Sequence, residues 1–220
     1  MNTQPWISVC EALSDLPSLF PNSRREYRYL KPNVLLPYRT DITNGYQKHM
    51  RNWTGKERRM VTGNSFRNNH RDFPIFAEMK PGDDYLKASE IADGIFEKAL
   101  QDSGINRFDH PKRFCQLKKD TVPPYSRNKF TSKWRRLQPE LPSHTLVAHL
   151  SVDTYSHIHP WEPRGITIRE AARLQSIPDC YLFSCSMGDA FRQIGNAVPP
   201  LLAEALALHI LKVIREGEND

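Results

Sequence analysis

The sequence has few cysteines, and their spacing forms neither a disulfide framework nor a metal site. Four occur in 220 residues, and no two of them form a Cys-x-x-Cys pair. They are Cys10, Cys115, Cys180 and Cys185. Small secreted domains need a denser set. His157 and His159 lie two residues apart without a matching Cys/His set. We therefore expect reduced thiols and no bound metal.

Long apolar runs are also missing. No run approaches the ~20 residues that cross a bilayer. Residues 1–10 lack the basic start and apolar stretch of a signal peptide. Hydrophobic residues make up 39% of the chain, which is enough for a core, while 17 prolines predict many turns. These features argue against membrane, collagen-like and small secreted proteins, and we expect no membrane partner.

Positive charge is concentrated in two blocks. Residues 24–71 carry 12 Lys/Arg against 3 Asp/Glu, and residues 107–136 carry 10 against 2, within a net charge of +6. The remainder of the chain is therefore acidic. Aromatic residues are interspersed in both blocks, a pattern that favours binding of a nucleic acid. The alternative is a solvated basic face whose aromatic residues belong to the core.

The periodicity of apolar residues predicts a mixture of helices, strands and loops. A capping-box pattern, Thr167 to Glu170, opens one of the helices. Residues 24–71 read as irregular and residues 107–136 as loop-like. The expected helices cover 9–16, 85–103, 168–175, 190–194 and 201–214, and the expected strands cover 145–150 and 155–159. The broad apolar face of 201–214 could close the chain's own core or dock onto a partner.

Two stretches carry a family resemblance. Arg164-Gly-Ile-Thr-Ile-Arg-Glu-Ala-Ala-Arg-Leu-Gln-Ser-Ile-Pro-Asp179 resembles the ninth conserved motif of DNA (cytosine-5) methyltransferases. Arg192-Gln-Ile-Gly-Asn-Ala-Val-Pro-Pro200 resembles the tenth, at the usual short distance downstream. Weaker similarity covers residues 9–17, 133–137, 142–145 and 159–160. Both the order and the density of the two motifs support the resemblance.

The resemblance covers only the C-terminal half of such an enzyme. The family's Phe-x-Gly-x-Gly turn, Pro-Cys nucleophile and Glu-Asn-Val segment do not occur in the 220 residues. We therefore expect an α+β fold, with a loop-rich target-recognition, DNA-binding domain over residues 1–160. Residues 161–220 would supply the two motifs and a C-terminal helix that packs on, and completes, a Rossmann-like catalytic domain.

The resemblance also implies roles for particular residues, none of them catalytic. Arg side chains read guanine edges or, like Lys, neutralise phosphates. The expected DNA-binding residues are Lys133, Arg135, Arg136, Arg127, Lys129, Arg51, Arg58 and Arg59. One wall of a shared S-adenosylmethionine pocket would comprise Asn196, Ala197 and Val198. The structural residues of the motifs would be Arg169, Glu170, Gln193 and Gly195.

Three hypotheses about function remain open. The chain could be the recognition part of a split methyltransferase whose catalytic half is a separate chain that shares S-adenosylmethionine. It could be an inactive remnant or fragment of a longer enzyme. The resemblance also implies a restriction-modification system. It could also be a stand-alone DNA-binding module. All three predict double-stranded DNA as a partner and a cytoplasmic, DNA-associated protein of a prokaryote.

Overall fold

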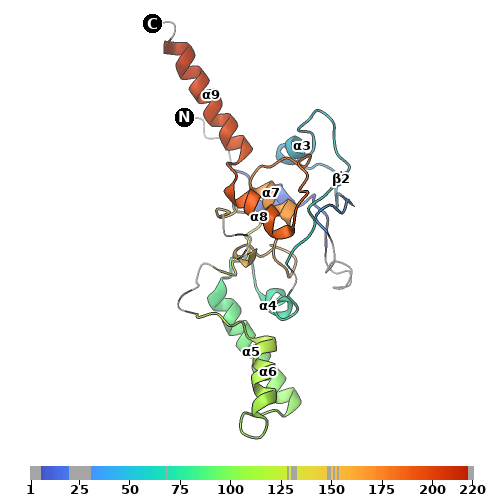
Figure 1. Cartoon of the computed structure of the whole chain (residues 1–220), viewed down its shortest axis with the longest axis vertical. Helices are drawn as coiled ribbons and strands as arrows, with labels where there is room; N and C mark the ends of the chain where they lie inside the picture. Colours follow the sequence, from blue (N-terminus) through green and yellow to red (C-terminus); the bar gives the residue numbers. More distant parts are fainter. Residues whose placement is uncertain are drawn as a thin grey trace.

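The computed structural model describes residues 6–19, 31–67, 69–127, 129, 133–147, 150, 152 and 154–217. A central body contains α7 (Ile168–Leu174), α8 (Met187–Asn196) and α3 (Gly45–Arg51), and two helical projections extend from its opposite ends (Figure 1). One projection is α9 (Pro200–Gly217). The other is a helical hairpin of α5 (Tyr85–Ser103) and α6 (Pro111–Thr121).

Strands are few in the described part of the chain. β1 (Leu36–Pro37) pairs antiparallel with β2 (Met60–Val61), with Leu36 opposite Val61. The short elements α1 (Val9–Leu13), α4 (Asp72–Glu78) and η2 (Thr154–Ser156) complete the described set. Helices with a small sheet agree with the α+β expectation.

The main core surrounds α7. It includes Val9 of α1, Leu137, Ile168 of α7 and Phe191 of α8, all nearly free of solvent contact. Residues from both sides of position 160 thus pack into one apolar cluster. The packing is continuous where the sequence predicted a domain boundary.

A second core is aromatic and joins α4 and α5 to the body. Trp134 lies edge-to-face against Phe76, Tyr85 and Tyr155, with ring centroids 4.9, 5.7 and 5.7 Å away. Such geometry suits the quadrupoles of aromatic rings and adds to the energy of burial. This cluster fixes the base of the α5–α6 hairpin.

Local capping explains where several helices begin and end. The predicted box at Thr167 and Glu170 is present: each side chain bonds the other residue's backbone N–H. Ser8 and Glu11 form a second capping box at α1, which the sequence analysis overlooked. α5 ends at Gly104, whose φ of +65° suits glycine.

Three predictions about local structure are wrong. The region 24–71, expected to be irregular, contains the helix α3 and both strands of the small sheet. The strands expected over 145–150 and 155–159 do not form in the described residues: residues 145–147 are irregular, Thr154–Ser156 is a 3₁₀ turn, and Ile158 makes only isolated bridges. The loop expected over 107–136 contains the helix α6, which begins at Pro111. Proline is favoured in the first turn of a helix, so this proline was a start signal.

α9 packs against no core in this structure. None of its residues is buried, and its large apolar side chains are 47–62% exposed. They are Leu202, Leu206, Leu208, Ile210, Leu211, Val213 and Ile214. By length and composition alone Met187–Gly217 could cross a membrane, a weak criterion that core helices of soluble proteins also meet. Residues 197–199 interrupt the segment between α8 and α9.

Candidate functional site

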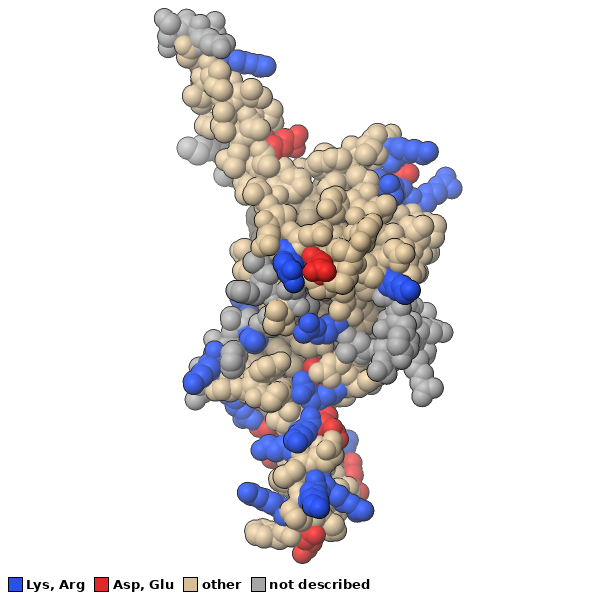
Figure 2. Space-filling view, in the orientation of Figure 1, with Lys and Arg blue, Asp and Glu red and all other residues tan. Residues whose placement is uncertain are grey.

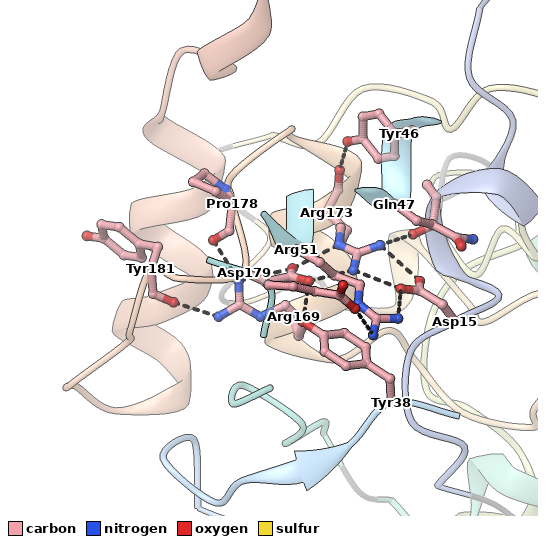
Figure 3. Close-up of polar contacts among 12 residues, drawn as sticks. Asp15, Tyr38, Tyr46, Gln47, Arg51, Arg169, Arg173, Pro178, Asp179 and Tyr181 are labelled. Atoms are coloured by element: carbon pink, nitrogen blue, oxygen red, sulfur yellow. Dashed lines mark hydrogen bonds and ion pairs between the residues drawn. The ribbon is translucent and has the colours of Figure 1, made fainter. Parts of the chain in front are cut away.

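A buried ionic network forms the rigid centre of the body (Figure 3). The Arg173 guanidinium donates to Asp15 at 3.0 and 3.2 Å and to Asp179 at 2.8 and 2.5 Å. All three side chains are inaccessible to solvent. Burial alone would raise the pKa of Asp179, but the hydrogen bonds and charge of Arg173 outweigh it and hold that pKa below its usual value. The network ties α7 to α1.

Arg51, a predicted DNA contact, belongs to this network. Its side chain is 6% exposed, stacks on the Tyr38 ring at 3.9 Å, and lies 3.6 Å from Asp15. It also donates to Glu57 and to the Thr40 carbonyl, at 3.1 and 3.2 Å. These internal contacts leave the guanidinium to brace α3 against the body.

Arg169 also serves the interior. Its guanidinium donates to the backbone carbonyls of Thr62, Pro178 and Tyr181, at 3.0, 3.1 and 2.6 Å. Its backbone passes so close to Gly63 that a Cβ at that glycine would lie 3.2 Å from the Arg169 nitrogen. Arg169 therefore joins two loops to α7, the one after β2 and the one between α7 and α8.

A second buried network surrounds Arg164. Its guanidinium donates to Glu162 at 2.7 Å and in a bidentate pair to Glu170, both contacts at 2.8 Å. Bidentate pairs of this kind fix orientation as well as charge. Glu162 in turn accepts from Ser18 at 2.7 Å. Glu170 is thus both the N-terminal cap of α7 and an ion-pair partner.

The segment 133–136 alternates between the interior and the surface. Trp134 is 1% exposed and has φ +56°, an unusual backbone conformation for a bulky residue. Lys133 is half-buried over the Tyr125 ring at 5.0 Å, and Arg135 is exposed. The Ile158 amide donates to the Arg135 carbonyl at 2.9 Å. The buried tryptophan therefore anchors a segment that presents Arg135 to solvent.

Arg136, another predicted DNA contact, lies on the buried side of the same segment. Its guanidinium donates to the carbonyls of Phe76, Met79 and Pro160, and its side chain is 8% exposed. Burial lowers the pKa of Arg136 from its usual value. The Arg136 side chain therefore connects the end of α4 to the backbone at Pro160.

The remaining predicted cations lie at the surface. Arg59 and Lys129 are exposed, and Arg58 is half-buried. Arg127 is exposed and pairs with Asp93 of α5. Together with Arg135 they stay predicted DNA contacts.

His144 is half-buried and His157 is buried, and the two lie against each other. The rings of His144 and His157 stack with centroids 3.8 Å apart. His157 Nε2 donates to the His144 carbonyl at 3.1 Å, while its Nδ1 faces the Ser156 hydroxyl at 2.8 Å. Burial lowers the pKa of His157 to about 3. The pair supports the loop rather than presenting a base to a substrate.

The turn that follows α8 is open to solvent. Asn196 and Val198 are exposed, whereas Ala197 packs partly on the main core. Gln193 contacts the Cys185 sulfur at 3.5 Å, and Gly195 lies on the last turn of α8. The three residues stay predicted contacts of S-adenosylmethionine, and the side chains of Asn196 and Val198 are open to solvent.

Sequence reasoning missed most of the buried ionic residues. Arg173 and Asp179 stood within the recognised motif, but Asp15 and Tyr38 had no local signal, because their partners lie far away in sequence. Glu162 was missed although its partner Arg164 is only two residues away. The clue in the sequence was that the short helix α7 combines apolar with charged residues. Charges that are buried need partners, so it predicted ionic contacts elsewhere in the chain.

Comparison with known proteins agrees with the two motifs. The sequence profile of C-5 cytosine-specific DNA methylases matches residues 31–212. The chain is 52% identical over 212 residues to a candidate type II methyltransferase of Oceanobacillus iheyensis, M.OihORF3336P, a match that covers 96% of this chain and 45% of that protein. It is 32% identical over 233 residues to the type II methyltransferase M.AgeI of Thalassovita gelatinovora, covering 93% and 50%.

A solved structure shares the fold. The crystal structure of a candidate DNA modification methyltransferase from an E. coli prophage matches with a TM-score of 0.57 and 22% identity, covering 100% of this chain and 49% of that one. The chain spans about half the length of the curated relatives it matches. The profile match extends over most of the sequence, and the chain therefore belongs to the C-5 cytosine-specific DNA methylase family.

Proposed function

We propose that this chain supplies the DNA-recognition part of a DNA (cytosine-5) methyltransferase and acts with a separate chain that supplies the catalytic part. The reaction is methyl transfer from S-adenosylmethionine to C5 of cytosine. The observation that carries the proposal is the anchored segment 133–136, where a strained, buried Trp134 holds Arg135 at the surface. Strain of this kind persists only where surrounding contacts impose it.

The chemistry of the reaction explains the division of labour. A thiolate adds to C6 of the cytosine, which must first leave the DNA stack. None of the chain's four cysteines follows a proline, as the family's nucleophile does. The residues described above instead bind, orient and brace. Their contribution would be to hold the duplex while another part of the enzyme performs the transfer.

The exposed cations suit a duplex. Lys and Arg neutralise phosphates, and an arginine can bond guanine O6 and N7 in the major groove. Arg135 and Lys133 are the first candidates, with Arg58, Arg59, Arg127 and Lys129 as supporting contacts. Arg127 would exchange its ion pair with Asp93 for a phosphate.

α9 supports the proposed partner. Figure 2 shows its projection almost free of charged side chains on the visible face, and its leucines and isoleucines are about half exposed. An apolar surface of this extent marks an interaction site in a soluble protein. A catalytic chain docked there would also cover Asn196, Ala197 and Val198 and complete the S-adenosylmethionine pocket.

Equilibrium binding of the full chain to duplex DNA tests the recognition role. Fluorescence anisotropy over a salt series should give a linear fall of log K with log salt, with a slope of several phosphate contacts. Absence of binding to any duplex at low salt would contradict the proposal. Reconstitution of methyl transfer, described below, tests the partner.

A further inference from the structure

We propose that the α5–α6 hairpin is a second DNA-contacting arm, and that a groove at its base binds phosphates of the duplex backbone. This rests on the proposed function, since it adds a contact surface to the recognition of DNA. We call this the hairpin groove and define it by its lining residues: Arg71, Cys115, Lys118, Lys119, Val122, Pro123 and Pro124. Its volume is about 430 Å³.

Charge is divided between the two helices of the hairpin. α5 carries four acidic and two basic residues, whereas α6 carries four basic residues and one acidic residue. The basic residues of α6 are Lys112, Arg113, Lys118 and Lys119, and all are exposed. Asp120 is engaged by the Gln116 amide at 2.9 Å. Figure 2 shows cationic side chains, with acidic ones beside them, on the visible face of this projection.

Cations from two separate elements converge on the hairpin groove. Lys118 and Lys119 come from the last turn of α6, and Arg71 directly precedes α4. A neighbouring hollow of about 490 Å³ shares Arg71 and Lys119 and adds Asn69, His70 and Asp120. Lysines at a helix C-terminus can merely complement the helix dipole. That explanation does not account for an arginine from another element at the same groove.

One side-chain nitrogen of Arg71 is enough to hold it in place. Its Nε donates to Asp72 at 2.6 Å, and the side chain is 19% exposed. Its two terminal nitrogens have no hydrogen-bond partner among the described residues. Asp72 is solvent-inaccessible, so the ion pair fixes the guanidinium in direction. A guanidinium oriented in this way matches the paired oxygens of a phosphodiester.

Part of the groove's lining is apolar and conformationally restricted, so it can pack against the deoxyribose rings of DNA. Val122, Pro123 and Pro124 provide it, and the two prolines restrict the chain after α6. A lining that combines cationic and apolar side chains suits the sugar-phosphate backbone of duplex DNA.

Charge removal tests the proposal against a matched control on α5. Lys118→Ala/Lys119→Ala and Lys87→Ala/Lys98→Ala each remove two positive charges from exposed positions of the same hairpin. The first double variant should lower the salt slope of duplex binding by about 2, because each lost phosphate contact removes about 0.9. The second should leave the slope within experimental error of wild type.

Protection of Cys115 gives a readout that needs no substitution. This exposed thiol lines the groove, so saturating duplex DNA should slow its alkylation by N-ethylmaleimide at least several-fold, measured by peptide mass spectrometry. The proposal is overturned if the two double variants weaken binding equally, or if wild-type protein binds DNA without protecting Cys115. Failure of wild-type protein to bind any duplex would overturn the proposed function as well, which distinguishes the two failures.

Discussion

Removal of Arg173 should cost a large part of the protein's stability. Arg173→Met keeps much of the side chain's bulk but leaves Asp15 and Asp179 facing each other across the core with no exposed surface. Removing one partner of a buried ion pair costs about 3–5 kcal/mol. The contacts of these carboxylates to Arg51 and Arg169, at 3.6 and 3.7 Å, are too long to replace the lost hydrogen bonds. Asp179 keeps the hydrogen bond from the Tyr38 hydroxyl at 2.6 Å, which carries no compensating charge.

That cost can be measured directly. For a domain of this size each kcal/mol lowers Tm by about 2–4 °C, so Arg173→Met should melt at least about 6 °C below wild type. Arg192→Met is the matched control, because its pair with Asp189 at 3.5 Å is largely exposed and is worth at most about 1 kcal/mol.

A rescue variant separates lost packing from uncompensated charge. Adding Asp15→Asn and Asp179→Asn to Arg173→Met removes both buried charges, so it should recover part of the lost Tm. The reasoning fails if Arg173→Met lies within about 2 °C of wild type in thermal unfolding followed by circular dichroism.

Three further predictions address the other parts of the account. Arg135→Ala should lower the salt slope of duplex binding by about one, whereas Lys212→Ala on α9 should not; equal slopes for the two variants would remove Arg135 from the interface. Gly63→Ala should cost about 1–3 kcal/mol in urea unfolding, because its φ is +84° and a Cβ would meet Arg169; Gly94→Ala, in an open helical position, should stabilise by about 0.5–1 kcal/mol. The His157 pKa is depressed to about 3, so the unfolded chain binds this proton first, and stability should fall as the pH drops below about 6.5, by up to about 1.4 kcal/mol per unit. His157→Gln should reduce that slope, and an unchanged slope would show that the ring does not carry it.

The positions of helices were predicted best where the sequence signals are local. α5 and α7 were predicted within a residue or so, because apolar periodicity and a capping box lie within the helices themselves. α9 was predicted from two prolines and an apolar repeat. Helix ends need only neighbouring residues, so these predictions did not depend on tertiary contacts.

The strands expected near residue 158 failed for a tertiary reason. Residues 155–159 have the alternation of a strand, yet Tyr155 is in a 3₁₀ turn that places its ring against Trp134. His157 then points into the stack with His144. Packing against distant aromatic rings overrode local preference.

The predicted DNA contacts include both exposed and buried cations, because charge in a sequence does not reveal how deeply a side chain is buried. Arg135 and Arg136 are adjacent and chemically identical, but one is exposed and the other bonds three carbonyls. Likewise, Arg51 is buried whereas Arg59 is exposed. Only the fold decides which guanidinium groups are left for a ligand.

Methyl transfer by reconstituted halves tests the central proposal most directly. Affinity capture with the tagged chain from its native host provides the candidate, which is the co-purifying chain with Pro-Cys and Phe-x-Gly-x-Gly. Each chain alone, and the two mixed, are then incubated with duplex DNA and tritiated S-adenosylmethionine. The account predicts 5-methylcytosine only in the mixture, and loss of that activity when α9 carries Leu206→Asp/Ile210→Asp. A mixture that stays inactive while the chain alone binds DNA would contradict the methyltransferase role.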